Sequence, residues 1–376
     1  MPTNHADTAV VGGGIIGLAH ALAAARRGDR VVLFERSGYS VGASIRSFGL
    51  VWPVGQPNGH LRQRALCTRE IWLEIARKTG MWCRESGSLH LARHKDEEAV
   101  LEEFLCINTA AADEGTRLVT SEEAAKFSSA VRTDGLLSAL WSPVELNIDP
   151  RQAIPALEAH LVDHYGVDIQ FGTTVRGVSL PHVETSKGIW HADRVFVCSG
   201  DDFETLYPQA FAASNITRCK LQMMRTAVQP DAWQLGAALC AGLTLLHSAA
   251  FRSCISLHEL RGRMEDAWPF QRDNGIHVLL SQTASGALII GGSHHYAHTH
   301  APFADENVNA AIMKYLHTFA HAPHLAIAQR WVGYYSSLNE GGTELVVQPE
   351  PGVIIVNGLG DAGMTLSFGL AEEVLG

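Results

Sequence analysis

The feature that most constrains this chain is a strand–helix–strand unit at its N-terminus, built around a G-x-G-x-x-G pattern. Residues 8–11 are an apolar strand candidate, and residues 15–27 are a proline-free helix candidate rich in Ala and Leu. Gly12 permits the tight turn, Gly14 lets the backbone approach a pyrophosphate, and Gly17 lets the helix pack closely on the strand. Because strand, turn, helix and second strand follow in this order, the unit predicts dinucleotide binding.

The second strand of this unit, residues 30–35, ends in an acid. Glu35 lies eighteen residues after Gly17, where a carboxylate accepts hydrogen bonds from ribose hydroxyls. The same carboxylate would repel a 2′-phosphate, which argues against NADP. The N-terminus of the intervening helix is predicted to bind the phosphates.

Length and charge narrow the class of protein further. A chain of 376 residues is long enough for two domains and a large core. Its 46% hydrophobic content is ordinary for a soluble globular protein. The net charge of −10, from 29 basic and 39 acidic residues, argues against a general nucleic-acid-binding surface.

No segment predicts secretion or a membrane span. Residues 1–5 lack the charged and apolar regions of a signal peptide, and the most apolar stretch, residues 233–250, contains two glycines and a histidine. The seven cysteines are odd in number, scattered and without a C-x-x-C pair. We expect a reduced, cytoplasmic protein.

The rest of the chain alternates between helix and strand candidates. Helices are expected at residues 60–78, 95–114, 147–166 and 306–319, and one opening at Ser121 as its cap. Strands are expected at residues 88–92, 168–172, 174–178, 194–198, 221–228, 277–280 and 287–290, with a hairpin turn at 186–188. Residues 352–374 return to strand, glycine loop and helix, whose N-terminus would face an electron-rich group such as a reduced flavin.

In their order and spacing, these segments resemble the family of FAD-dependent amine and amino-acid oxidoreductases that includes D-amino-acid oxidase, glycine oxidase and sarcosine oxidase. The resemblance rests on residues 10–35, 42–44, 147–157, 174–178, 195–200, 220–226, 329–333 and 358–365. Within it, ASIRSFGLVWPVGQP at residues 43–57 is similar to a branch whose members accompany phosphonate-degradation enzymes.

The resemblance implies an α/β fold in which a Rossmann-like, GR2-type FAD-binding domain is interleaved with an α+β substrate domain. The substrate domain is expected to be built on a mixed, largely antiparallel sheet. The FAD-binding domain would comprise residues 1–84, 147–219 and 330–376, and the substrate domain residues 85–146 and 220–329. The residues implied to hold FAD are Gly12, Gly14, Ile15, Ile16, Gly17, Glu35, Arg36, Ser44, Val175, Ser199, Gly200, Gly360, Gly363, Met364 and Thr365.

Two departures from the family pattern limit what the resemblance implies about the substrate. Amino-acid oxidases of the family carry an arginine after a Trp-x-Gly signature to bind the substrate carboxylate, whereas RWVGYYSS places Tyr334 and Tyr335 there. Sarcosine oxidases attach the flavin through a cysteine after this signature, but no cysteine follows Cys254. An α-amino acid therefore loses its expected anchor, and non-covalent FAD is predicted.

Three residues are predicted to act on the substrate. Arg46 lies in the loop beside the expected flavin site, and a guanidinium makes paired hydrogen bonds to phosphonate or carboxylate. His295 belongs to the polar cluster after the strand at residues 287–291, and a pocket histidine accepts an amine proton near neutral pH. Tyr335 would donate its hydroxyl in place of the missing arginine. The alternatives left open are His60, Arg62, Arg64, Arg225, His294, Tyr296 and Tyr334.

The histidine-rich stretch at residues 294–300 lacks a matching Cys or carboxylate pattern, so no metal site is predicted. The implied reaction is oxidation of a C–N bond by hydride transfer to flavin N5, followed by hydrolysis of the imine. The substrate is expected to be a small anionic amine, such as 2-aminoethylphosphonate or its N-methyl derivative, and oxygen or another acceptor takes the electrons. The alternatives are a glycine, sarcosine or D-amino-acid oxidase, a 2-hydroxy-acid dehydrogenase, and an FAD-binding scaffold without turnover.

Overall fold

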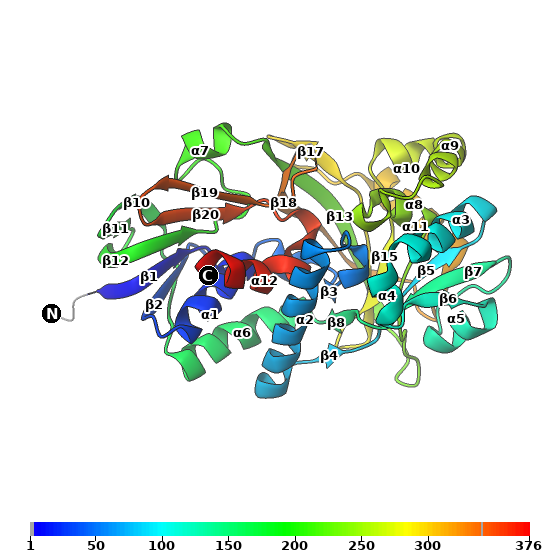
Figure 1. Cartoon of the computed structure of the whole chain (residues 1–376), viewed down its shortest axis with the longest axis horizontal. Helices are drawn as coiled ribbons and strands as arrows, with labels where there is room; N and C mark the ends of the chain where they lie inside the picture. Colours follow the sequence, from blue (N-terminus) through cyan, green and yellow to red (C-terminus); the bar gives the residue numbers. More distant parts are fainter. Residues whose placement is uncertain (1–3, 340) are drawn as a thin grey trace.

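Two sheets lie side by side along the long axis of the molecule in the computed structural model, which describes residues 4–339 and 341–376. The first sheet contains the first and last strands of the chain, β1 (His5–Val11) and β20 (Val353–Asn357), and lies to the left in Figure 1. The second lies to the right, and its long strands β13 (Ile216–Val228) and β18 (Ile327–Leu338) reach back toward the first. The space between the sheets is therefore bordered by segments from both.

The first sheet contains the predicted strand–helix–strand unit. Its strand order is β10-β11-β12-β1-β2-β9, and β20 pairs with both β12 and β19. The pairs β1–β12, β1–β2, β2–β9 and β12–β20 are parallel, as expected of a sheet with helical crossovers. Its strands are β1 (His5–Val11), β2 (Val31–Glu35), β9 (Asp168–Phe171), β10 (Val175–Ser179), β11 (His182–Thr185), β12 (Gly188–Val197), β19 (Leu345–Glu350) and β20 (Val353–Asn357).

Four helices from distant parts of the chain pack together beside the first sheet: α1 (Ile15–Arg26), α2 (His60–Thr79), α6 (Pro150–Tyr165) and α12 (Gly363–Leu375). Trp72 of α2 is fully buried and lies edge-on to Phe368 of α12, with ring centroids 5.0 Å apart. Its indole N–H donates to the carbonyl of Met364 at 3.0 Å. This packing fixes the start of α12 next to the start of α1.

The second sheet is mixed and largely antiparallel. Its order is β17-β13-β16-β15-β14-β5-β7-β6, with β18 paired to β13, and only β14–β5 is parallel among its described pairs. The further strands are β5 (Ser88–Ala92), β6 (Arg117–Val119), β7 (Ser138–Ser142), β14 (Ala238–Ala241), β15 (Leu279–Gln282), β16 (Ala287–Gly291) and β17 (His295–Ala297). A small sheet, β3 (Leu50–Val51), β8 (Leu146–Ile148) and β4 (Cys83–Arg84), lies between the two large ones.

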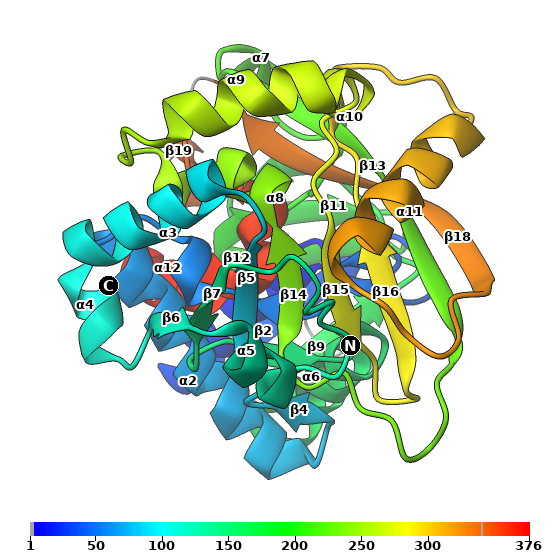
Figure 2. The same cartoon turned by 90° about the vertical axis from the view of Figure 1, so that its right-hand side faces the viewer.

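Short helices surround the second sheet in Figure 2, with α9 and α10 above it and α11 beside it. They are α3 (Lys95–Ile107), α4 (Thr109–Asp113), α5 (Ser121–Phe127), α8 (Gly242–His247), α9 (Leu257–Ala267), α10 (Pro269–Asp273) and α11 (Glu306–Phe319), while α7 (Pro208–Ala212) lies near the first sheet. Four single turns, η1 (Ser44–Arg46), η2 (Pro53–Gly55), η3 (Ala249–Phe251) and η4 (Gly360–Ala362), complete the described elements. The core under the sheet includes Phe104, Phe251 and Phe319.

The predicted fold class is confirmed, and two local predictions were wrong in detail. The helix expected at residues 95–114 is two helices, α3 and α4, interrupted at Asn108. The cap of α5 is Thr120 rather than Ser121, because the Thr120 hydroxyl accepts from the N–H of Glu123 and the Glu123 carboxylate accepts from Thr120 N–H. The expected domain division stays a proposal, and its boundaries at residues 219 and 330 fall inside β13 and β18.

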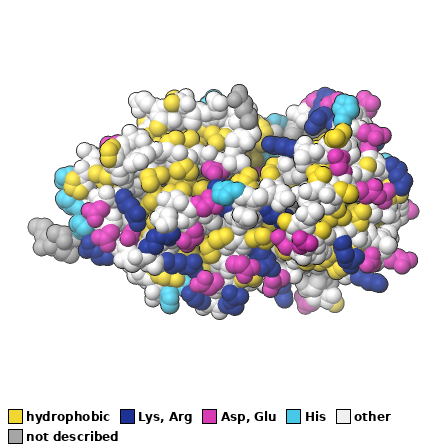
Figure 3. Space-filling view, viewed as in Figure 1, with side chains coloured by type: hydrophobic (Ala, Val, Ile, Leu, Met, Phe, Trp, Pro, Cys, Tyr) yellow, Lys and Arg dark blue, Asp and Glu magenta, His cyan; other side chains and the backbone are white. Residues whose placement is uncertain are grey.

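The distribution of surface charge and the state of the cysteines are those expected from the sequence. Acidic and basic side chains are interspersed on the face shown in Figure 3. None of the helices described is long and apolar enough to cross a membrane. All seven cysteines are free thiols.

Candidate flavin and substrate site

A cavity of about 780 Å³ lies between the two large sheets. Three glycine loops and part of the loop after β2 border it on the side of the first sheet. Ionisable and aromatic side chains border it on the side of the second sheet, among them Arg46, His247, His277, His294, Tyr296, Tyr334 and Tyr335. A volume of this size lies in the upper part of the range for cofactor and small-molecule sites.

The first glycine loop joins β1 to α1 and has no room for side chains. Gly12 has a φ of +108°, and a Cβ there would lie 2.2 Å from the carbonyl oxygen of Cys198. A Cβ on Gly17 would lie 2.0 Å from the carbonyl oxygen of Gly12. Glycine is therefore required at both positions, as the sequence pattern predicted, and the start of α1 remains accessible to a phosphate.

Glu35 and Ser44 hold this loop in place. The Glu35 carboxylate accepts hydrogen bonds from the N–H groups of Gly13, at 2.9 Å, and Ser37, at 2.8 Å. The Ser44 hydroxyl accepts from the N–H of Ile15 at 2.9 Å, at the first residue of α1. Both side chains lie in the cavity lining, so each is placed where the nucleotide half of FAD was expected.

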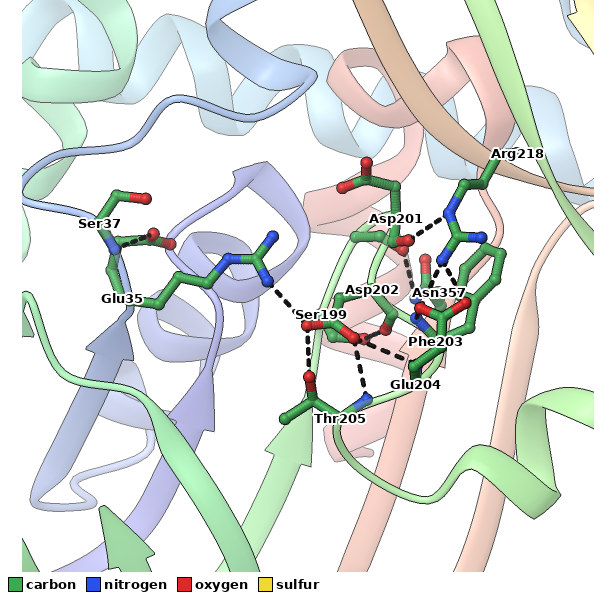
Figure 4. Close-up of polar contacts among 12 residues, drawn as sticks. Glu35, Ser37, Ser199, Asp201, Asp202, Phe203, Glu204, Thr205, Arg218 and Asn357 are labelled. Atoms are coloured by element: carbon green, nitrogen blue, oxygen red, sulfur yellow. Dashed lines mark hydrogen bonds and ion pairs between the residues drawn. The ribbon is translucent and has the colours of Figure 1, made fainter. Parts of the chain in front are cut away.

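The second glycine loop follows β12 and is tied down by polar side chains (Figure 4). Asn357 donates to the carbonyl of Gly200 at 2.9 Å, and the Ser199 hydroxyl donates to the carbonyl of Asp202 at 2.6 Å. Asp202 in turn accepts from the N–H and hydroxyl of Thr205. It also accepts from Arg36 at 2.8 Å, so Arg36 contributes to the loop through a carboxylate partner.

The third glycine loop leads into α12. Gly360, Gly363, Met364 and Thr365 all line the cavity, as does Val175 of β10. A Cβ on Gly363 would lie 3.5 Å from Ile15, so the starts of α1 and α12 meet at the cavity. Two helix N-termini therefore point partial positive charge toward it, which suits a diphosphate and a reduced flavin.

Arg46 connects the loop after β2 to the second sheet. Its backbone carbonyl accepts from the Trp331 indole at 3.1 Å, and its guanidinium donates to the Val332 carbonyl at 3.2 Å. In the part of the chain that the structure describes, no carboxylate pairs with this guanidinium. Arg252, which sequence reasoning missed, also lines the cavity, and no described side chain pairs with it.

Of the other two predicted catalytic residues, Tyr335 lines the cavity and His295 does not. Tyr335 on β18 lines the cavity, is 8% exposed, and lies 6.3 Å from His294 between ring centroids. His295 lies opposite Lys220 in the antiparallel pairing of β17 with β13. It is not part of the cavity lining, although its neighbours His294 and Tyr296 are. Roles in catalysis for Arg46, His295 and Tyr335 stay predictions.

Most of the cationic alternatives have structural partners. Arg62 pairs with Glu114, Arg64 pairs with Glu344 and Glu373, and His60 lies 3.2 Å from Glu373. Arg225 donates to Ser285 at 2.6 Å. None of these four cations belongs to the cavity lining.

A cluster of three histidines and one aspartate is the main feature that the sequence did not predict. His247 and Asp361 lie 3.0 Å apart, between Nε2 and Oδ2, and His277 and His294 pack beside them. Burial lowers the pKa of His294 to about 4, with a smaller contribution from the charge of His247. Burial alone would raise the pKa of Asp361, but the hydrogen bond from His247 and the charges of His247 and His294 lower it to about 2.

The arrangement of the rings does not suit one metal ion shared by all four residues. Their possible ligand atoms lie within 4.8 Å of one another. However, His247 and His277 are stacked, with centroids 3.8 Å apart and planes 20° apart. An imidazole nitrogen directs its lone pair in the plane of its ring, so two nearly parallel stacked rings do not converge on one ion. The cluster is a group of packed imidazole rings with one hydrogen bond to a carboxylate, between His247 and Asp361.

The three glycine loops and the acid at the end of β2 define a dinucleotide-binding protein. Its second sheet faces the part of the cavity expected to hold the substrate. A family model described as FAD dependent oxidoreductase, the DAO family, matches residues 7–375. The chain therefore belongs to this family and is an FAD-dependent oxidoreductase. The sequence matches no curated protein.

Solved structures share the whole fold at low sequence identity. L-proline dehydrogenase from P. horikoshii superposes with a TM-score of 0.78 at 20% identity, covering 99% of this chain and 92% of that one. Glycine oxidase from Bacillus cereus ATCC 14579 gives 0.76 at 18%, covering 98% and 93%. Iminodiacetate oxidase from Chelativorans sp. BNC1 gives 0.72 at 17%, covering 98% and 94%.

The cavity fits FAD on the evidence of its own residues. A Cβ on Gly14 would approach the Ser44 hydroxyl to 3.4 Å, so the wall near α1 is shaped by main chain and small side chains. Among the described residues, Cys198 is the one cysteine in the lining, and burial raises the pKa of its thiol far above the usual range. A protonated thiol is a poor nucleophile, which supports non-covalent binding of the flavin.

Proposed function

We propose that this protein oxidises the C–N bond of a small anionic amine, and that its substrate is an aminoalkylphosphonate such as 2-aminoethylphosphonate or its N-methyl derivative. The observation that carries the proposal is that Arg46 and Arg252 line the cavity without a carboxylate partner among the described residues. By contrast, Arg36 in the same lining pairs with Asp202. Unpaired guanidinium groups in a cavity bind anions with charge-assisted, paired hydrogen bonds.

The related solved structures favour an amine over other classes of substrate as the hydride donor. Glycine oxidase, L-proline dehydrogenase and iminodiacetate oxidase, by their names, act on amines, and all three share the fold. Bound FAD would accept a hydride, with its two electrons, from the C–H bond next to the amine nitrogen, and water would then hydrolyse the imine. The residues of this chain must bind the anion, orient the carbon and favour the unprotonated amine.

The phosphonate class is favoured over an α-amino acid by the residues around Tyr335. The position after Trp331 and Gly333 where amino-acid oxidases of the family place an arginine is occupied here by tyrosines. A phosphonate offers three acceptor oxygens, which suits two guanidinium groups and the hydroxyls of Tyr334 and Tyr335. A single carboxylate offers two.

The test is anaerobic reduction of the FAD-loaded protein, followed as bleaching of the flavin absorbance. 2-Aminoethylphosphonate and its N-methyl derivative are compared with glycine, sarcosine, D-alanine and a 2-hydroxy acid. Rapid bleaching by the phosphonates alone is the expected result. Bleaching by the amino acids or the hydroxy acid alone would overturn the phosphonate assignment, and bleaching by none of them would favour an FAD-binding scaffold. Admitting oxygen afterwards and measuring peroxide separates an oxidase from a dehydrogenase.

A further inference from the structure

We propose that His247 and Asp361 form the proton-accepting pair of this active site. Nδ1 of His247 takes the ammonium proton of the bound amine, and Asp361 holds the imidazole in the tautomer that leaves Nδ1 free. This inference rests on the proposed amine oxidation, but it does not depend on whether the anion is a phosphonate or a carboxylate.

The geometry of the pair fixes the tautomer. His247 is the last residue of α8, and Asp361 lies in η4, in the glycine loop before α12. His247 Nε2 lies 3.0 Å from Asp361 Oδ2. A carboxylate that keeps a pKa near 2 only accepts hydrogen bonds at neutral pH, so Nε2 carries the proton. No described residue makes a hydrogen bond to Nδ1 of His247, and its lone pair is free to accept a proton.

The pair also lies in the cavity, next to the loop that is expected beside the flavin ring. Both residues line it, and the Asp361 side chain is 51% accessible although protein surrounds the cavity. Asp361 follows Gly360 and precedes Gly363, the loop residues expected beside the flavin ring. His247, the base, is hydrogen-bonded to Asp361 of this loop and is therefore close to the position where the C–N bond of a substrate must lie for hydride transfer.

The other histidines nearby are poorer candidates. His277 is 4% exposed, and neither of its ring nitrogens has a hydrogen-bond partner. His294 is 8% exposed, and its Nδ1 donates to the carbonyl of Gly275 at 3.0 Å. Burial lowers the pKa of both, and neither forms an ion pair with a carboxylate. His295 lies outside the cavity lining.

Burial keeps most of the ionisable side chains around the pair uncharged. The ionisable groups that face it are Asp361 itself, His277, His294, Tyr296, Tyr335 and Cys219, with Arg252 further along the lining. Asp361 is the one acid among them. The Asp361 carboxylate lies against Nε2 of His247, whereas burial lowers the pKa of His277 and of His294.

The step is a proton transfer without a change in oxidation state. The ammonium N–H bond breaks, the Nδ1–H bond forms, and the electron pair of the broken bond becomes the lone pair of the neutral amine. That lone pair is required before the neighbouring carbon can lose hydride. His277, stacked 3.8 Å from His247, keeps the imidazole from turning away from the cavity.

The proposal is tested by anaerobic stopped-flow reduction of the FAD-loaded protein between pH 6 and 10. At pH 7, His247→Gln should slow flavin reduction by about 100-fold, the lower end of the contribution of a positioned general base. Its rate should recover only as pH approaches the pKa of the free amine. Asp361→Asn should slow reduction about 10-fold, and added imidazole should partly rescue His247→Ala. The matched control is His258→Gln, an exposed histidine on α9, which should match the wild type.

Two outcomes would overturn the pair while leaving the proposed function standing. One is a His247→Gln protein that is reduced at the wild-type rate with the wild-type pH profile. The other is the same pH shift in His295→Gln instead. Flavin content is measured for each variant, so that loss of cofactor is not mistaken for loss of a base.

A second measurement needs neither substrate nor flavin reduction. NMR of protein labelled with ¹⁵N in its histidine rings, with the His247 signals assigned by their loss in His247→Gln, should show Nε2 protonated and Nδ1 bare. The preference should weaken in Asp361→Asn. A His247 ring protonated at Nδ1 instead would overturn the pair, even if no amine reduces the wild type and the proposed function itself fails.

Discussion

The two walls of the cavity are built by different means. The wall from the first sheet presents main chain: Gly12 and Gly200 lie in loops after strands, and Gly363 begins α12, so none of them places a side chain in the cavity. The wall from the second sheet presents side chains that carry charge or hydroxyls, such as Arg46 and His247. A diphosphate and an isoalloxazine are recognised by backbone groups and helix ends, whereas a particular small amine is selected by side chains.

This difference has a consequence for sequence change. Main-chain recognition depends on glycines with fixed neighbours, so a single added carbon disrupts it. Side-chain recognition is distributed over β17, β18, α8 and η4, so each substitution removes only part of the interaction. The two walls should therefore respond to mutation and to pH in distinct ways.

The largest effect is expected from Gly12→Ala. The new Cβ would meet the carbonyl oxygen of Cys198 at 2.2 Å in a backbone with φ of +108°, so the loop cannot keep its shape. FAD affinity should fall more than about 100-fold, measured by recovery of flavin fluorescence on dilution. Gly38→Ala is the control, since a Cβ there meets nothing within 4 Å. Equal FAD content in both variants would refute main-chain recognition at Gly12.

A large effect of pH on the free energy of unfolding is expected from a histidine in the second sheet. His90 of β5 is fully buried between Trp52 and Phe251, and neither ring nitrogen has a partner. Burial lowers its pKa to about 3. A histidine with a lowered native pKa stabilises the fold fully above about pH 6.5, and this stability is lost as pH falls from 6.5 toward 3, because the unfolded state takes up the proton first.

The share of His90 in acid sensitivity is measurable by urea unfolding at pH 7 and pH 4. At about 1.4 kcal/mol for each pKa unit, His90 should account for about 3 kcal/mol of the lost free energy of unfolding. His90→Leu, which has a similar volume, should remove that part of the pH dependence. An unchanged pH dependence in the variant would show that His90 is not held neutral.

A smaller effect is expected from Arg46→Ala. Loss of charge-assisted hydrogen bonds costs about 1.5–3 kcal/mol, so the dissociation constant of an aminoalkylphosphonate should rise about 10- to 100-fold while FAD content stays at the wild-type value. Arg176→Ala, on the exposed face of β10, is the control. Unchanged substrate affinity in Arg46→Ala would assign the anion to Arg252 or to the tyrosines.

The smallest effect is expected from Glu35→Gln. The glutamine keeps one oxygen, which can accept from the N–H of Gly13 or of Ser37, but it lacks the negative charge of the carboxylate. FAD affinity should therefore fall about 10-fold, which corresponds to about 1.4 kcal/mol, and substrate affinity should be unchanged. Isothermal titration of the apoprotein with FAD measures the first quantity. A gain in affinity would mean that the carboxylate repels the nucleotide instead of binding its ribose.

Much of the fold was predictable because its signals are local. The hydrophobic runs and glycines of β1, α1 and β2 lie within thirty-five residues of one another, and their hydrogen bonds follow from that order. The cap of α5 shows the limit of such local prediction. Thr120 and Ser121 both carry hydroxyls suited to a cap, and only the backbone geometry selects Thr120.

The sequence predicted more of the cofactor side of the site than of the substrate side. Arg46 and Tyr335 were found because a loop and a signature marked their positions, and both line the cavity. No pattern in the sequence pointed to His247 or Asp361. His247 ends a short helix within an apolar stretch, and Asp361 lies in a loop that appeared to serve the flavin alone.

The sequence by itself determined the nucleotide-binding unit, because the contacts of Gly17 with Gly12 and of Glu35 with Gly13 are made within one strand–helix–strand unit. The tertiary structure decided the substrate wall. His247 and Asp361 are more than a hundred residues apart in the chain, and their side chains meet, 3.0 Å apart, only in the folded protein. Charge and hydrogen bonding between such distant residues depend on packing that no local pattern encodes.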